Sequence, residues 1–145
     1  MMLFGWCGRG VLTAIEAHDP STPLFFFWAA HTIHAPLQVP KLWYDRYAHV
    51  DDARRRKYLA MVNWLDTAIS NVTGLLKTKQ MYNSTLIVFS SDNGGPIYFG
   101  GNSGANNFPL RGGKASNWQV RTAPVISPAI VFDHQDFLVC REAFG

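Results

Sequence analysis

The segment from Thr85 to Gly95 places an acid and an amide directly after an apolar run. It reads Thr-Leu-Ile-Val-Phe-Ser-Ser-Asp-Asn-Gly-Gly, so Asp92 and Asn93 are adjacent. Carboxylate and amide oxygens are ligands that calcium and magnesium accept, and the two glycines let the backbone turn away closely. The same residues also make a good turn, so this segment alone leaves a metal site and a plain turn both open.

A second segment that could do chemistry spans residues 106–118 and reads Asn-Asn-Phe-Pro-Leu-Arg-Gly-Gly-Lys-Ala-Ser-Asn-Trp. Two cations, Arg111 and Lys114, flank a pair of glycines where an anion could approach the backbone amides. Cationic side chains and backbone N–H groups together are suited to cradle a tetrahedral oxyanion. A flexible loop with two solvated charges would have the same composition, so both interpretations remain open.

Two histidines, His31 and His34, lie in a segment that contains two prolines and spans residues 31–40. The residue before each proline is pushed away from helical geometry, so a loop is expected here. Imidazole can be charged or neutral near neutral pH, which suits His34 to a reaction site. For His31 we expect a packing or hydrogen-bonding role.

Two strands precede these polar segments. Residues 23–30, Pro-Leu-Phe-Phe-Phe-Trp-Ala-Ala, predict a buried strand whose Phe25, Phe26, Phe27 and Trp28 belong to the core. Residues 85–90 predict a second buried strand.

A long amphipathic helix is predicted between the strands, beginning at about Asp51, with Asp51 or Asp52 as its N-cap. Apolar residues recur there at spacings of three and four: Tyr58, Met61, Val62, Leu65, Ala68, Ile69, Val72, Leu75 and Leu76. Strand, helix and strand in this order predict a parallel α/β sheet, in which the crossover returns the chain to the same end. His34 and Asp92–Asn93 should then share the edge formed by the carboxyl ends of the strands, where ligands bind in open α/β sheets.

The composition fits one ordinary folded domain. The chain has 145 residues, 48% of them hydrophobic and 16% charged, with a net charge of +3. The basic run Arg54–Lys57 is interpreted as a solvated helix face, so nucleic acid is not expected as a partner. No segment is apolar over a length that would span a membrane, and no signal peptide is visible. Asn71 and Asn83 begin N-x-[ST] sequons and are candidate glycosylation sites.

Three motifs carry a resemblance to sulfatases: His34 to Pro40, Asp92 to Gly95, and Pro109 to Lys114, in that order along the chain. From about Thr13 to Ile126 the chain resembles part of an arylsulfatase, closest to the arylsulfatase B type. The resemblance implies an α/β fold of the alkaline-phosphatase-like (sulfatase) type, a mixed, mostly parallel sheet with flanking helices, present only in part. It divides the chain into an N-terminal extension (1–12), a partial catalytic domain (13–131) and a divergent tail (132–145).

The resemblance also implies roles for individual residues in the metal-dependent hydrolysis of sulfate esters. Asp92 and Asn93 would ligate a divalent cation, usually calcium, and Lys114 would bind the sulfate oxygens. His34 would contact the ester and assist protonation of the leaving group. Arg111 belongs to the substrate-binding motif, where we expect it to organise the loop rather than touch the substrate directly. The implied substrates are sulfated carbohydrates or aryl sulfates, and the implied location is lysosomal or secreted.

The chain departs from the family at its nucleophile. The cysteine that sulfatases convert to formylglycine lies in C-x-P-S-R, and neither Cys7 nor Cys140 has that context. The paired aspartates that complete the metal site are also missing, and Asp51–Asp52 is no substitute because it begins the predicted helix. We therefore expect the chain alone to be inactive, to bind calcium weakly and to be poorly soluble.

Three interpretations stay open. The sequence could be part of a working sulfatase. It could instead be a non-catalytic product that acts as an interaction or decoy module, for example by binding a full-length sulfatase through a sheet edge. It could also come from a phosphatase or phosphomutase of the same superfamily, although such enzymes would be richer in histidine ligands.

Overall fold

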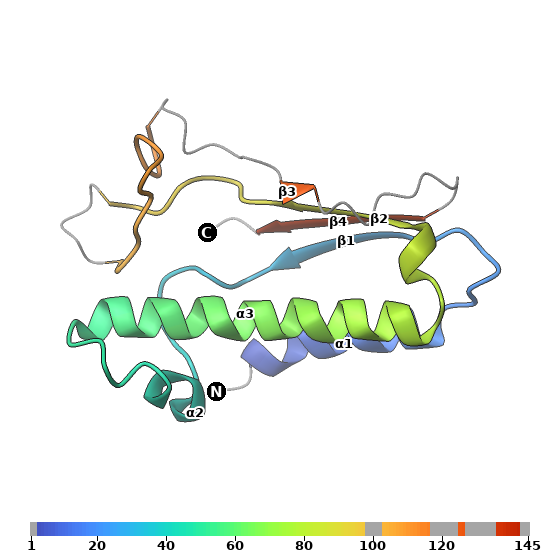
Figure 1. The fold of residues 1–145 in the computed structure, drawn as a ribbon, viewed down its shortest axis with the longest axis horizontal. Helices are drawn as coiled ribbons and strands as arrows, with labels where there is room; N and C mark the ends of the chain where they lie inside the picture. The colour runs from blue at the N-terminus through green and yellow to red at the C-terminus, as the bar shows by residue number, and fades with distance from the viewer. Residues whose placement is uncertain (1–2, 98–102, 117–124, 127–135, 143–145) are drawn as a thin grey trace.

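The fold is a sheet covered on one side by two helices (Figure 1). The computed structural model describes residues 3–97, 103–116, 125–126 and 136–142. Its elements are α1 (Leu3–Ala17), β1 (Phe25–Ala30), α2 (Lys41–Asp45), α3 (Ala53–Thr78), the short 3₁₀ helix η1 (Tyr82–Ser84), β2 (Thr85–Ser90), β3 (Val125–Ile126) and β4 (Asp136–Glu142).

The sheet has four strands in the order β1-β4-β2-β3. The β4 strand runs parallel to both of its neighbours, with Phe25 of β1 and Leu86 of β2 both opposite Phe137, while β3 pairs antiparallel with β2. The predicted α/β fold with a mixed, mostly parallel sheet is therefore confirmed. The crossover from β1 through α3 to β2 places the carboxyl ends of both strands at one edge.

The predicted long helix is confirmed as α3, and its N-cap is Asp52. The side chain of Asp52 accepts hydrogen bonds from the backbone N–H groups of Arg54 and Arg55, at 2.9 and 2.7 Å. These contacts satisfy two of the amides that a helix leaves unpaired at its start. Five residues of α3 are buried: Ala60, Met61, Leu65, Val72 and Leu76.

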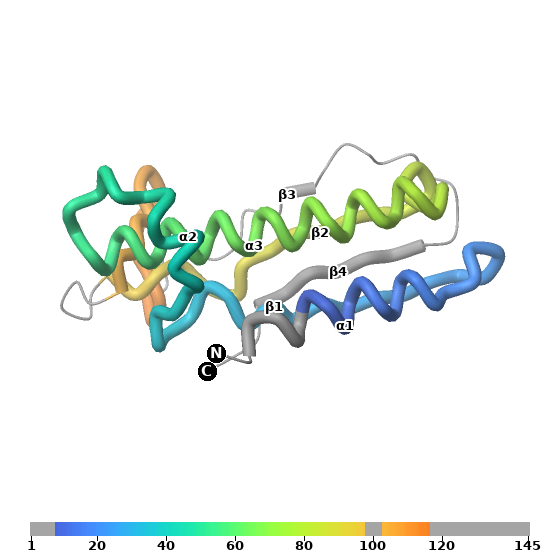
Figure 2. The backbone as a smooth tube through the Cα atoms, turned by 90° about the horizontal axis from the view of Figure 1, so that it is seen from below, coloured from blue at the N-terminus to red at the C-terminus, as the bar shows by residue number. Residues whose placement is uncertain are grey.

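The helix α1 was not predicted, and it lies beside α3 on the same side of the sheet (Figures 1 and 2). Its Val11 and Ile15 belong to the same buried cluster as Leu65 and Val72. Lys79 follows α3, and its Nζ donates to the carbonyl oxygens of Glu16 and His18, at 2.7 and 2.6 Å. The ammonium group donates hydrogen bonds to carbonyl groups at the C-terminal end of α1. Its positive charge also interacts favourably with the negative end of the helix dipole.

The first strand differs from the prediction in one respect. Trp28 is 4% exposed and Phe26 packs against the core, but Phe25 is 69% and Phe27 is 46% exposed. The expectation that Phe25 and Phe27 are core residues is therefore wrong. Side chains alternate between the two faces of a strand, and among the described elements the helices cover only one face of the sheet.

The division of the chain at residues 12/13 and 131/132 remains a prediction. The first boundary falls within α1, which runs from Leu3 to Ala17. The second precedes β4, which lies between β1 and β2 in the sheet. Among the described residues, no helix is long and apolar enough to cross a membrane.

Candidate active site

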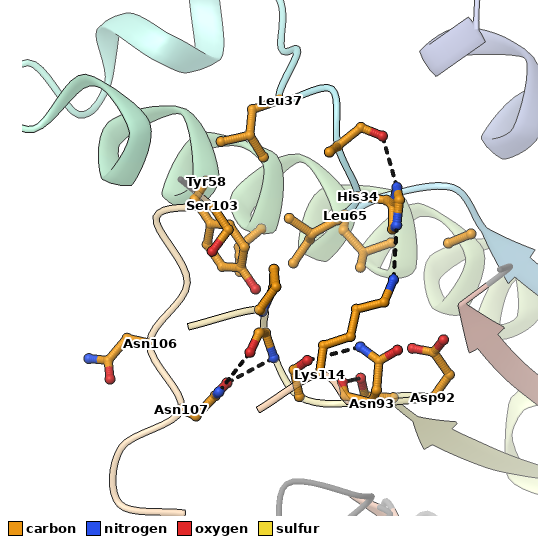
Figure 3. A pocket seen from close by; sticks show the side chains of 18 of the residues that line it. His34, Leu37, Tyr58, Leu65, Asp92, Asn93, Ser103, Asn106, Asn107 and Lys114 are labelled. Atoms are coloured by element: carbon orange, nitrogen blue, oxygen red, sulfur yellow. Dashed lines mark hydrogen bonds between the residues drawn. The ribbon is translucent and has the colours of Figure 1, made fainter. Parts of the chain in front are cut away.

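Three loops surround a pocket of about 700 Å³ at the carboxyl ends of β1 and β2 (Figure 3). The loop after β1 contributes His31 and His34, and the loop after β2 contributes Asp92 and Asn93. Lys114 comes from a third loop, residues 103–116, and α3 supplies a wall with these residues: Tyr58, Val62, Leu65, Asp66 and Ile69. The structure thus brings together four predicted site residues, His34, Asp92, Asn93 and Lys114, from three separate segments of the sequence.

His34 and Lys114 meet inside this pocket. The Nζ atom of Lys114 lies 3.3 Å from Nε2 of His34, and Nδ1 of His34 lies 2.8 Å from the carbonyl oxygen of Ala35. Because a carbonyl oxygen only accepts, Nδ1 carries the hydrogen, and Nε2 keeps a lone pair that accepts from the lysine ammonium. The contact with Ala35 therefore fixes the imidazole ring and directs Nε2 toward the cation.

Asp92 and Asn93 line the same pocket. Asn93 Nδ2 donates to the carbonyl oxygen of Gly94 at 2.9 Å, and Ser91 Oγ donates to the backbone oxygen of Asn93 at 2.6 Å. With its nitrogen engaged, the amide of Asn93 keeps its oxygen for another partner. Within the described part of the chain, the Asp92 carboxylate has no hydrogen-bond or ion-pair partner.

These two residues fit a divalent cation as part of a ligand set. A carboxylate and an amide oxygen are the hard donors that calcium prefers, but calcium takes about six to eight oxygens. No cluster of three or more His, Cys, Asp or Glu side chains that could hold a metal occurs among the described residues. Asp92 and Asn93 can therefore contribute to a calcium site but do not complete one.

The second and third loops are joined through Gly95. Asn107 accepts from Gly95 N and donates to Gly95 O, both at 2.9 Å, and the backbone N–H of Lys114 also donates to Gly95 O at 3.2 Å. A Cβ atom added at Gly113 would lie 2.6 Å from Gly95 O, so this approach requires glycine. The path of the backbone at Lys114 thus depends on the loop that carries Asp92 and Asn93.

Sequence reasoning gave Asn107 no role. Asn107 is next to a second asparagine, and nothing in its type or position indicates whether its side chain binds another loop or only water. The wall from α3 was predicted only as a buried helix face, and Val62, expected on that face, is 38% exposed because it borders the pocket.

Lys114 lines the pocket, whereas Arg111 of the same loop lies outside it. Arg111 is exposed and does not line the pocket, and it makes no hydrogen bond or ion pair with any other described residue. His31, for which we expected a packing or hydrogen-bonding role, is an exposed residue that lines the pocket. The sequon asparagines are both exposed, Asn71 within α3 and Asn83 within η1, and their glycosylation stays a prediction.

Known proteins similar to this chain are sulfatases. The family model described as Sulfatase matches residues 9–126. Arylsulfatase J of Mus musculus is 43% identical over 105 residues, which cover 72% of this chain and 17% of that protein. N-acetylgalactosamine-6-sulfatase of Sus scrofa is 28% identical over 97 residues, which cover 67% of this chain and 17% of that protein.

A solved structure resembles the chain in fold as well as in sequence. The crystal structure of Ps i-CgsB in complex with k-i-k-neocarrahexaose matches with a TM-score of 0.70 and 30% identity, over 82% of this chain and 26% of that one. The chain thus spans only 17% of the length of the curated relatives named above. The family match covers most of the chain and includes all three loops of the pocket, and the chain belongs to the Sulfatase family.

Proposed function

We propose that the protein containing this chain hydrolyses sulfate esters at the pocket described above, with a divalent cation, expected to be calcium, as its cofactor. The observation that carries this proposal is the contact between Lys114 and His34 in a pocket that also holds Asp92 and Asn93. In the hydrolysis of a sulfate ester, negative charge shifts on the sulfate oxygens. A bound cation, a lysine and a histidine around one cavity can stabilise that charge.

Each residue has a distinct task in this proposal. Lys114 Nζ donates to a sulfate oxygen and holds the ester in place. His34 Nε2, released from Lys114 when the sulfate binds, faces the bridging oxygen; in its charged form the imidazole donates a proton there as the sulfur–oxygen bond breaks. Asp92 and Asn93 hold the cation, which when bound offsets charge on the sulfate oxygens. A new sulfur–oxygen bond forms to an oxygen that comes from water, while the protons of that water go to His34 and to solvent. The alcohol leaves with the proton from His34, and sulfate is released.

The lining of the same pocket supports a substrate class. It includes the polar groups named above and also Leu37, Tyr58 and Val62. Such a mixed lining suits an aryl sulfate or a sulfated carbohydrate, with the sulfate toward Lys114. The names of the relatives, an arylsulfatase and an N-acetylgalactosamine-6-sulfatase, support both classes. A lysosomal or secreted location is part of the proposal and rests on the family.

The chain by itself is proposed to be inactive. No cysteine in it stands in the C-x-P-S-R context from which the family's formylglycine is made. The residues described here would then supply the cation ligands, the lysine and the histidine, and the nucleophile would come from elsewhere in a longer protein.

A non-catalytic interaction module is the second candidate, and one observation favours it. Among the described strands β1 lies at the edge of the sheet, and its Phe25 and Phe27 are exposed on the face that no described helix covers. An edge strand with apolar neighbours can pair with another chain, such as a full-length sulfatase.

One experiment separates the two candidates. The native product is captured from source tissue with an antibody against residues 44–56, its intact mass is measured, and it is assayed with 4-methylumbelliferyl sulfate and 4-methylumbelliferyl phosphate. We expect a species several times heavier than 16.3 kDa that hydrolyses the sulfate, loses activity with a calcium chelator and leaves the phosphate intact. A species near 16.3 kDa without hydrolysis would contradict the enzymatic proposal and leave the interaction module. Preferred hydrolysis of the phosphate would instead point to a phosphatase.

A further inference from the structure

Asn107 lines the pocket, yet its side chain is engaged entirely with the backbone of two loops. The Oδ1 atom accepts from Gly95 N and Nδ2 donates to Gly95 O, both at 2.9 Å (Figure 3). The Nδ2 atom also donates to Gly112 O at 2.9 Å. A side-chain amide has two N–H donors, and both are used here. Asn107 therefore has no hydrogen left to offer a bound substrate and acts through the backbone that it holds.

The three hydrogen bonds join the segments that carry the site residues. Gly95 closes the segment that contains Asp92 and Asn93, and Gly112 lies just before Lys114. Among the described residues, the only other hydrogen bond between these segments runs from Lys114 N to Gly95 O, at 3.2 Å. Asn107 thus supplies most of the hydrogen bonding by which the cation-binding pair and the sulfate-binding lysine keep their relative positions.

We propose that Asn107 is a positioning residue for sulfate-ester hydrolysis, which sets the place of Lys114 relative to Asp92 and Asn93. This inference rests on the proposed function. Groups that stabilise developing charge must be held in place before the reaction, and small displacements of such groups cost large factors in rate.

The amide group is the only side chain of this shape that satisfies all three partners. Aspartate has the same shape, but as a carboxylate it has no hydrogen to donate and would place negative oxygen against the carbonyl groups of Gly95 and Gly112. Below about pH 4 a carboxylic acid regains one O–H donor. The defect caused by Asn107→Asp should therefore become smaller as the pH falls.

The neighbouring asparagine provides a matched control. Asn106 is exposed, also borders the pocket, and uses Oδ1 to accept from Phe108 N at 3.0 Å. In Figure 3 its side chain points away from the hydrogen bonds of Asn107. An aspartate at position 106 can accept the same bond, so Asn106→Asp adds the same charge without removing a donor to the backbone.

The test combines hydrogen exchange with kinetics in the protein that contains this chain. In the wild type we expect slow exchange of the Gly95 amide. In Asn107→Asp, repulsion between the carboxylate and the carbonyl oxygens of Gly95 and Gly112 should move the side chain away from the Gly95 amide as well, and exchange should become faster by about tenfold or more. For Asn107→Asp we expect kcat/KM for 4-methylumbelliferyl sulfate to be about 10- to 100-fold below that of the wild type at pH 7. Near pH 4 the difference from the wild type at the same pH should be smaller. Asn106→Asp should leave the exchange of the Gly95 amide as in the wild type and should lower kcat/KM less than Asn107→Asp does.

Several results would overturn the inference. An unprotected Gly95 amide in the wild type would show that the contact does not form. Equal losses in Asn106→Asp and Asn107→Asp would indicate a general effect of charge. If Asn107→Asp does not fold, Asn107→Ser removes the same bonds without adding a charge, and wild-type kinetics in that variant would count against positioning. A wild type that does not hydrolyse sulfate esters would overturn the proposed function, whereas an active wild type with a free Gly95 amide would overturn only the role of Asn107.

Discussion

Lys114 Nζ lies 3.3 Å from His34 Nε2, although the two residues are 80 positions apart in the sequence. The contact joins the loop after β1 to the loop that follows β2 and Gly95, so it depends on the parallel crossover that places both strand ends at one edge. Only the fold brings these two side chains together, and it does so at the edge of the sheet where α/β proteins bind ligands. The contact is therefore stronger evidence for a ligand site than either residue alone.

Asp92 should dominate the affinity of the site for calcium. Its carboxylate lines the pocket and has no hydrogen-bond or ion-pair partner among the described residues, so replacement by alanine removes charge without breaking the fold. In the protein that contains this chain, we expect Asp92→Ala to weaken calcium binding by about tenfold or more in isothermal titration, given the dependence of affinity on ligand charge. Asp66→Ala removes another carboxylate that borders the pocket and should leave affinity nearly unchanged. Equal losses in both variants would contradict the assignment.

The isolated chain should bind calcium only weakly, because Asp92 and Asn93 supply two of the oxygens that the cation needs. Isothermal titration of the purified chain that gave micromolar affinity would contradict this expectation.

Gly113 should not tolerate a side chain. A Cβ atom there would lie 2.6 Å from Gly95 O, so the two loops would have to separate. We expect Gly113→Ala to destabilise the fold by about 1–3 kcal/mol, as overpacking usually does, and to lower activity. Gly74→Ala is the matched control, because nothing lies within 4 Å of the added atom on α3, and it should stabilise the helix by about 0.5–1 kcal/mol. Thermal unfolding of the two variants decides between these outcomes.

Asp52 should contribute to the stability of α3 through its two bonds to Arg54 N and Arg55 N. Replacing an N-cap aspartate by alanine costs about 1 kcal/mol, and we expect that loss in Asp52→Ala by chemical denaturation. Asp51→Ala changes the neighbouring acid, which makes no hydrogen bond with other described residues, and should be close to neutral. An unchanged midpoint for Asp52→Ala would count against the cap.

The exposed phenylalanines of β1 should limit the solubility of the isolated chain. Phe25 and Phe27 are 69% and 46% exposed on the uncovered face of the sheet. We expect the double replacement Phe25→Thr with Phe27→Thr to raise the concentration at which the chain stays monomeric in light scattering. Phe26→Thr changes the residue that packs against the core and should lower stability instead. A wild-type chain that is monomeric and unfolds in one sharp transition would contradict the expected low solubility.

The sequence was sufficient for the elements with a strong pattern. The helix α3 followed from apolar spacing, and the acids at its start indicated Asp51 or Asp52 as the cap, of which the structure has Asp52. The strand β2 followed from an apolar run with a turn after it. The helix α1 was missed because Gly8 and Gly10, residues of low helix propensity, lie in the middle of it.

The remaining features depend on relationships that a linear pattern does not contain. Four consecutive aromatic residues indicate a strand, but not whether one face or both faces are covered, so the exposure of Phe25 and Phe27 could not be anticipated. The role of Asn107 depends on backbone groups of Gly95 in another loop, and a side-chain-to-backbone contact of this kind leaves no signature in residue type.

A double-mutant cycle measures whether His34 and Lys114 act together on a bound sulfate ester. In the protein that contains this chain, kcat/KM for 4-methylumbelliferyl sulfate is measured for His34→Ala, Lys114→Ala and the pair, with His49→Ala as an exposed control. We expect each single replacement to lower kcat/KM by about 10²–10³-fold, and the pair to fall short of the product by more than about tenfold, because the residues act as a unit. Single variants that retain wild-type rates, or losses that simply multiply, would contradict the account.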